Sequence, residues 1–185
     1  MLYEKLKRHI SLITVILIIL IFSALNYFLG AEGFVNLIGE ENSYLLAFLV
    51  ATFGGASFLT ASSYYLIIIT LALGGTNFIL LGVAGGLGNS IGDTLFYLLG
   101  LKGRKTLGRV KKITDRIFNW LNTKPPWMIP VFVFLYANLV PLPNDILAVS
   151  LGVCKYPFKK LIIPLVLGNI SFTMLVVLFV QYFFY

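Results

Sequence analysis

The sequence predicts an all-α integral membrane protein, built as an inverted repeat of a re-entrant helical hairpin plus a transmembrane helix and preceded by one N-terminal transmembrane helix. The first observation is composition: the 185 residues are 59% apolar and only 11% charged, whereas soluble domains are about 45–50% apolar and about 25% charged. The second is that the basic residues, which give a net charge of +7, cluster between apolar runs. This pattern indicates membrane orientation and not nucleic-acid binding.

Residues 1–185 are predicted to form a single membrane domain. At about 20 residues per span, the chain has room for at most about seven crossings and none for a separate catalytic domain, so we expect no enzymatic activity. The apolar run over residues 10–29 follows a basic N-terminus and is longer than the roughly 7–15-residue core of a signal peptide, although cleavage stays open as an alternative. Because positive flanks stay inside, we expect a multi-pass protein of the cell membrane with a cytoplasmic N-terminus.

The first repeat is predicted over residues 44–100. Its apolar stretch 44–73 is interrupted by small and polar residues at 53–57 and at 60–63, and a long span over 76–101 follows. That span leads into a dense basic segment, which the positive-inside rule places in the cytoplasm. A single crossing over 44–73 would send this basic segment outside, so we expect the stretch to enter and return on one face, as a re-entrant hairpin or a pair of short spans.

The basic segment is predicted to form a cytoplasmic amphipathic helix over residues 103–124. Apolar residues recur every three or four positions with cations between them, which is typical of a helix lying on the inner leaflet. Its cations either anchor it electrostatically or bind a specific lipid head group.

The second repeat is predicted over residues 127–185. Pro141 and Pro143 break its apolar stretch into two helices, because proline lacks an N–H donor and clashes with the preceding turn. Lysines between 155 and 160 keep the far end in the cytoplasm. This stretch is therefore a second hairpin, entered from inside, and residues 161–185 leave as the final span.

A shift of 80 residues aligns the two repeats. It pairs Phe78 with Phe158 and Gly88-Asn89 with Gly168-Asn169. Inverted repeats with helices broken near mid-membrane recur in transporters. Since unpaired backbone groups in hydrocarbon cost several kcal/mol each, such breaks persist only inside protein or beside a wet cavity. We therefore expect the two breaks to meet.

Polar and helix-breaking residues near the breaks are the candidate transport or cavity residues. They are Asp93, Asp145, Asn138, Asn144, Pro141, Pro143, Ser62 and Ser63. An acidic side chain at the centre of a span costs about 2.5–3.5 kcal/mol, so both acids call for a reason. Asp145 follows the proline break and serves transport, caps the next helix, or does both. Asp93 lies deeper in a helix and either faces a cavity or bonds to a neighbouring helix, and the same alternatives apply to Asn89, Asn138 and Asn169.

Four glycines are the candidate helix-packing residues, since their spacing lets helices approach closely. They are Gly82, Gly86, Gly88 and Gly92. No Gly-Lys-Ser/Thr follows, so they do not form a phosphate loop. Cys154 is the only cysteine, and no spacing of His, Cys and carboxylates suggests a metal site. We expect no cofactor.

Residues 88–100, with Gly88, Gly92 and Asp93 in order, resemble a conserved segment of the DedA family, also called VTT-domain or SNARE-associated membrane proteins. Residues 138–145 followed by Gly152 resemble that family's second re-entrant break, and the resemblance covers roughly residues 44–175. It implies two re-entrant hairpins meeting head to head. It also implies movement of phospholipids or polyprenyl-phosphate carriers across the bilayer, by scramblases or with proton coupling.

The chain departs from the family pattern at the residues around the breaks. Many members have Arg three positions before and three after the proline matched to Pro141, where this chain has Asn138 and Asn144. The first hairpin of members often carries Pro-x-Pro, where this chain has residues 61–63, Ala-Ser-Ser. Losing both arginines weakens the expectation of a phosphate held by charge.

Three functions follow from these observations. The first is movement of lipid or polyprenyl-phosphate head groups across the bilayer, as a flippase or scramblase, with membrane lipids as partners. The second is transport of a small solute or ion coupled to protons through Asp145. The third is a non-transport role as a membrane assembly factor, with the hairpins as structural plugs.

Overall fold

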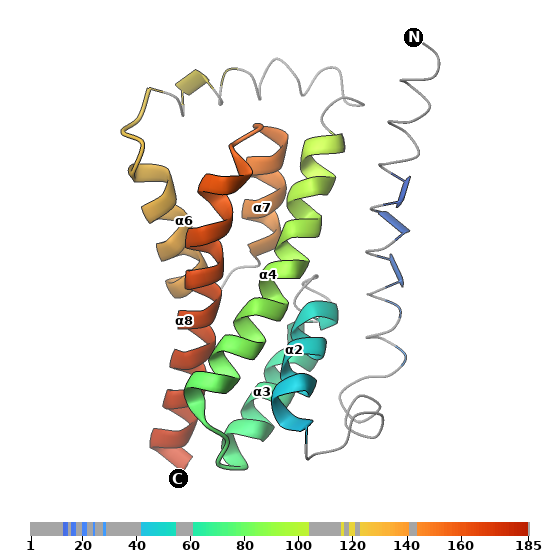
Figure 1. The fold of residues 1–185 in the computed structure, drawn as a ribbon, viewed down its shortest axis with the longest axis vertical. Helices are drawn as coiled ribbons and strands as arrows, with labels where there is room; N and C mark the ends of the chain where they lie inside the picture. Colours follow the sequence, from blue (N-terminus) through green and yellow to red (C-terminus); the bar gives the residue numbers. More distant parts are fainter. Residues whose placement is uncertain are drawn as a thin grey trace.

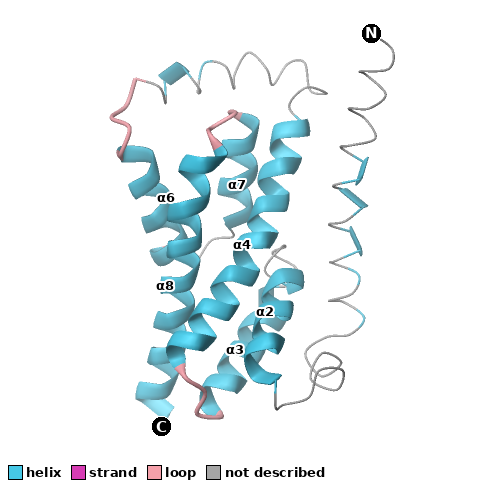
Figure 2. Ribbon diagram, in the orientation of Figure 1, coloured by secondary structure: helices cyan, strands magenta, loops and turns pink. Residues whose placement is uncertain are grey.

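The structure, a computed structural model, describes residues 42–54, 61–103, 123–140 and 144–184, with isolated positions between 13 and 28 and between 116 and 120. Its helices are α2 (Ser43–Gly54), α3 (Ala61–Leu73), α4 (Phe78–Gly103), α6 (Met128–Leu139), α7 (Asn144–Val153) and α8 (Phe158–Phe184) (Figures 1 and 2). The described part of the chain therefore has helices and no strands, and the all-α prediction is confirmed for it.

Some predicted features lie outside the described residues. These are nearly all of the first span over 10–29, nearly all of the amphipathic helix over 103–124, and the chain at both breaks, residues 55–60 and 141–143, with Pro141 and Pro143. The breaks are thus known from the helices that flank them.

Two helices, α4 with 26 residues and α8 with 27, are long and apolar enough to cross a membrane. They lie side by side and run in opposite directions (Figure 1). The start of α4 is fixed by Asn77, whose Oδ1 accepts hydrogen bonds from the backbone N–H groups of Ile79 at 2.9 Å and Leu80 at 3.2 Å, so it acts as an N-cap.

The four shorter helices form two pairs at opposite ends of the long helices. In Figure 1, α2 runs up to mid-height and α3 returns to the end where α4 begins, whereas α6 runs down to mid-height and α7 returns to the end where α8 begins. Helix α4 packs mainly against α2, α7 and α8, with a smaller contact to α3, and α8 also packs against α6 and α3. Each long helix thus contacts short helices from both pairs.

Glycines allow the closest of these approaches. A Cβ atom built on Gly86 of α4 would lie 2.5 Å from the Cα of Ile170 in α8, and one on Gly168 of α8 would lie 2.7 Å from the Cβ of Ala137 in α6. A Cβ on Gly88 would meet the backbone carbonyl oxygen of Phe48 in α2. Any larger residue at these positions would push the helices apart.

The turns that end α3 and α7 have the same construction. Gly75 and Lys155, 80 positions apart, both have positive φ, at 75° and 58°. The N–H groups of the next residues, Thr76 and Tyr156, bond back to the carbonyls of Leu71 at 3.4 Å and Leu151 at 2.9 Å. This is the left-handed helix end that glycine favours, and Lys155 adopts it with a side chain.

The buried apolar side chains form two clusters. One joins α2, α3 and α4 to the C-terminal half of α8, with Leu46, Val50, Ile68, Leu81 and Val177 among its members. The other joins α6 and α7 to the C-terminal half of α4 and the start of α8, with Tyr97, Val133, Ala148, Leu161 and Leu165 among its members. The part of α4 and α8 that lies between these two clusters carries buried polar residues.

Candidate functional site

A polar layer separates the two apolar clusters. It consists of Ser90 and Asp93 on α4 and Asn169 and Thr173 on α8, and none of these side chains is more than 3% exposed. Buried polar groups are costly unless they are hydrogen-bonded. The hydrogen bonds of these four residues therefore account for their place in the core.

Asn169 is the centre of this layer. Its amide nitrogen donates to Asp93 Oδ2 at 2.8 Å and to Ser90 Oγ at 3.0 Å. Its amide oxygen accepts from the Nδ2 groups of Asn144 at 2.7 Å and Asn89 at 3.4 Å. One side chain of α8 thus connects three residues of α4 with the first residue of α7.

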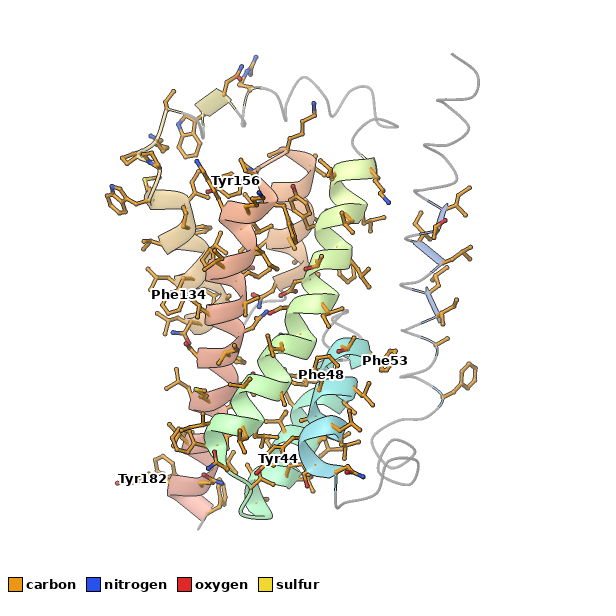
Figure 3. All side chains as sticks on the ribbon, viewed as in Figure 1. Tyr44, Phe48, Phe53, Phe134, Tyr156 and Tyr182 are labelled. Atoms are coloured by element: carbon orange, nitrogen blue, oxygen red, sulfur yellow. The ribbon has the colours of Figure 1, made fainter. Side chains whose placement is uncertain are left out.

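The two helices that follow the breaks, α3 and α7, both begin beside the same turn of α8. Asn144, the first residue of α7, bonds to Asn169. Tyr64, in the first turn of α3, has its hydroxyl 2.7 Å from Thr173 Oγ1. Thr173 uses its only hydrogen to donate to the carbonyl oxygen of Asn169, so Tyr64 is the donor. Since Asn169 and Thr173 are four residues apart, α3 and α7 converge within one helical turn of α8. Figure 3 draws the described side chains on the ribbon.

The two predicted acids lie close to this turn. Asp93 is 1% exposed and bonds to Asn169, which is the neighbouring-helix contact that was one of its two alternatives. Asp145 lies in the first turn of α7 and is partly exposed. Its carboxyl group accepts a hydrogen bond from its own backbone N–H and lies within electrostatic reach of Asp93.

Two buried side-chain oxygens near the second break have no hydrogen-bond partner among the described residues. They are Oδ1 of Asn138, in the last turn of α6, and Oδ1 of Asn144, at the start of α7. Native interiors leave few such groups unpaired, so each one calls for an explanation.

The predicted packing glycines are distributed over two faces of α4. Gly82 and Gly86 face Met174 and Ile170 of α8, Gly88 faces α2, and Gly92 is buried. Ser62 and Ser63 belong to the first turn of α3, but their side chains lie outside the described part. Within that part, no three His, Cys, Asp or Glu side chains lie close enough to hold a metal ion.

Sequence reasoning missed two members of the polar layer, Ser90 and Thr173, and also Tyr64, which bonds to Thr173. Ser90, Thr173 and Tyr64 were not candidates, because a hydroxyl in a helix is satisfied by its own backbone as often as by a neighbour. A signal for the layer was present in the 80-residue shift, which aligns Asn89 with Asn169. The structure bonds these two residues to each other.

Comparison with known proteins gives no relative: no family model, no curated protein and no solved structure matches this chain.

Proposed function

We propose that the chain is a multi-pass protein of the cell membrane, with its N-terminus in the cytoplasm, in which two broken hairpins form a polar seam that passes lipid head groups between leaflets. The lipid tails stay in the bilayer while the head group crosses. The observation that carries the proposal is the convergence of α3 and α7, through Tyr64 and Asn144, on one turn of α8.

The exposed surface supports the membrane setting. Besides the two helices long enough to span, large apolar side chains face outward along α8, with Ile163 64%, Leu167 51% and Phe179 60% exposed. On α6, Phe132 and Leu139 are 55% and 62% exposed. Continuous apolar faces of this kind are rare on soluble monomers, whereas lipid covers them at no cost.

The arrangement of the helices supports an inverted repeat. Helices α4 and α8 begin 80 residues apart, at Phe78 and Phe158, and run in opposite directions. Asn89 bonds to Asn169, its own counterpart under the same shift. A residue that contacts its counterpart lies on the axis relating the two units, as in a two-fold dimer interface.

A path for lipid head groups would explain why the helices are broken. Broken helices are tolerated at membrane depth only inside protein or beside water, and in transporters they mark the substrate path. Here the first turns of α3 and α7 bond to the polar layer that holds Asp93, and Asp145 lies within electrostatic reach of Asp93. The resemblance to the DedA family supports the same class of substrate.

Reconstitution into vesicles tests this function. Vesicles carrying a trace of tail-labelled fluorescent phospholipid are treated with a membrane-impermeant quencher, and we expect the protein to expose inner-leaflet label that empty vesicles protect. Asn169→Leu should slow this exposure, since it removes the contact that joins α7 to α8. Ser150→Ala is the matched control, because Ser150 is exposed and bonds only within its own helix, to Ile146. Full inner-leaflet protection by the wild-type protein would refute the proposal.

A second function, proton-coupled transport of a small solute or ion, is favoured by one observation. Asp93 and Asp145 interact electrostatically across α4 and α7, and paired intramembrane acids recur in proton relays. This function predicts solute-dependent pH changes inside vesicles that Asp145→Asn abolishes. A pH response that persists in Asp145→Asn would exclude it.

A further inference from the structure

Three lysines lie around the start of α8, at one end of the helix bundle. Lys155 lies in the turn that joins α7 to α8, and Lys159 and Lys160 lie in the first turn of α8. All three residues are exposed, and we call them the lysine cluster. Figure 1 places this end of the bundle, where α4 ends and α8 begins, opposite to the turn that joins α3 to α4.

The equivalent turn in the first half of the chain carries no charge. Eighty positions before the lysine cluster stand Gly75, Ile79 and Leu80, and the last two are 49% and 52% exposed. That turn has the same backbone construction, with a positive φ and a hydrogen bond back to the preceding helix. The fold of this turn therefore does not require lysines.

Lys155 occupies a backbone position that disfavours lysine. Its φ of 58° lies in the left-handed region, where a Cβ atom crowds the following carbonyl oxygen. The equivalent residue is Gly75, the type that such helix ends favour. Lysines that only orient the chain in a membrane act from any position in the loop, so that role does not require the strained position. A lysine kept there indicates a role for its side chain in the folded protein.

An exposed apolar stripe continues along α8 from the lysine cluster. Ile163 and Leu167 follow Lys159 at intervals of four residues, so the three side chains lie on one face of the helix. Ile163 is 64% exposed and Leu167 is 51% exposed. At a rise of about 1.5 Å per residue, this face extends about 12 Å from Lys159 to Leu167. Cations at one end and an apolar stripe beside them match the two parts of a phospholipid.

We propose that the lysine cluster and the stripe beside it bind an anionic phospholipid of the surrounding bilayer. The phosphate of the lipid lies at the lysines, and one acyl chain lies along Ile163 and Leu167. This rests on the membrane setting of the proposed function and not on lipid movement. A zwitterionic head group brings its own cation toward the lysines, so phosphatidylglycerol should bind more tightly than phosphatidylcholine. Each lysine near an anionic lipid raises the affinity about fivefold, so the complete cluster should raise it about 100-fold.

Thermal unfolding in a non-ionic detergent tests the preference. Short-chain phosphatidylglycerol should raise the unfolding temperature of the wild type at lower concentration than phosphatidylcholine with the same tails, by ligand linkage, and added salt should reduce the difference. The ratio of the two apparent affinities is compared within each variant, so that a change in basal stability does not enter it. Equal affinities of the wild type for the two lipids would overturn the proposal.

Two variants of equal charge locate the site. Lys155→Asn removes one charge and leaves a residue that the left-handed position tolerates, and it should lower the affinity ratio about fivefold. Lys124→Gln also removes one charge, but the Lys124 ammonium lies 4.5 Å from the centre of the Trp120 ring, outside the cluster, so the ratio should stay nearly constant. Equal losses would mean that net charge alone attracts the lipid and would overturn the proposed site.

Soluble anions distinguish a lipid from other partners. Inorganic phosphate and a short poly-glutamate peptide should stabilise the wild type much less than phosphatidylglycerol, because neither covers the apolar stripe. An equal effect of phosphate or of the peptide would place a soluble anion or an acidic protein segment at the cluster and overturn the lipid form. A preference for phosphatidylglycerol in a protein that moves no lipid would keep this site and refute the proposed function. Lipid movement without that preference would overturn this inference and leave the proposed function standing.

Discussion

Replacing Asn169 by leucine should be among the most destabilising single changes in the polar layer. Leucine has the same branched side-chain skeleton as asparagine, with bulkier methyl groups, but can neither donate nor accept a hydrogen bond. The change removes the bonds to Asp93, Ser90 and Asn144 at 2.8, 3.0 and 2.7 Å and the weaker contact with Asn89 at 3.4 Å. It leaves the buried Asp93 carboxyl without this donor.

The magnitude follows from these bonds. Side-chain hydrogen bonds between membrane helices contribute about 0.6 kcal/mol each, so the three short ones together contribute about 2 kcal/mol. Leaving a buried carboxyl oxygen unpaired costs about 1–3 kcal/mol more. We therefore expect Asn169→Leu to lower the free energy of unfolding by about 3–5 kcal/mol.

Titration with a denaturing detergent, followed by circular dichroism, measures this loss. Asp93→Leu alone should cost less, and the double variant Asn169→Leu with Asp93→Leu should recover about 1–2 kcal/mol of the summed losses, because removing both partners leaves no orphan group. If the loss of stability in the double variant equals the sum of the two single losses within about 0.5 kcal/mol, the reasoning is refuted. Such additivity would mean that Asp93 and Asn169 do not stabilise each other.

Two further predictions concern the backbone. Gly86→Ala places a Cβ against Ile170 and should lower the free energy of unfolding by about 1–3 kcal/mol. Gly103→Ala is the control and should not lower the free energy of unfolding, because no atom lies within 4 Å of the added Cβ. Equal losses of stability for the two variants in the same detergent titration would contradict the close crossing of α4 and α8. Lys155→Gly should raise the free energy of unfolding by about 0.5 kcal/mol and Gly75→Ala should lower it by about 1 kcal/mol, because both positions have positive φ. If both variants changed the free energy of unfolding in the same direction, the two turns would differ.

Much of the helical plan could be predicted from the sequence. The break at Pro141 was predicted between two apolar halves, and the flanking helices end at Leu139 and begin again at Asn144. The long helices were expected over 76–101 and 161–185 and extend over Phe78–Gly103 and Phe158–Phe184. These features follow from composition along short segments, because apolar length and proline act on their own neighbours in the chain.

The role of Asn169 could not be predicted in the same way. Asn89 and Asn169 were noted only as polar residues that either line a cavity or bond between helices. Which of the two applies depends on how the helices rotate about their axes, and neighbouring residues in the chain do not determine that rotation. The same holds for Tyr64 and Thr173, which are 109 positions apart and meet at 2.7 Å.

The sequence by itself determined that this chain is helical, where its helices break, and that a shift of 80 residues aligns its halves. Only the tertiary structure decided that α3 and α7 bond to the same turn of α8, and that the Oδ1 atoms of Asn138 and Asn144 are left without a hydrogen-bond partner among the described residues. The physical reason is the range of the interactions in sequence. Helix formation and helix breaking depend on groups within about one helical turn of each other. The pairing of buried polar groups depends on side chains brought together by packing, and each one must find its partner on another helix or remain unpaired.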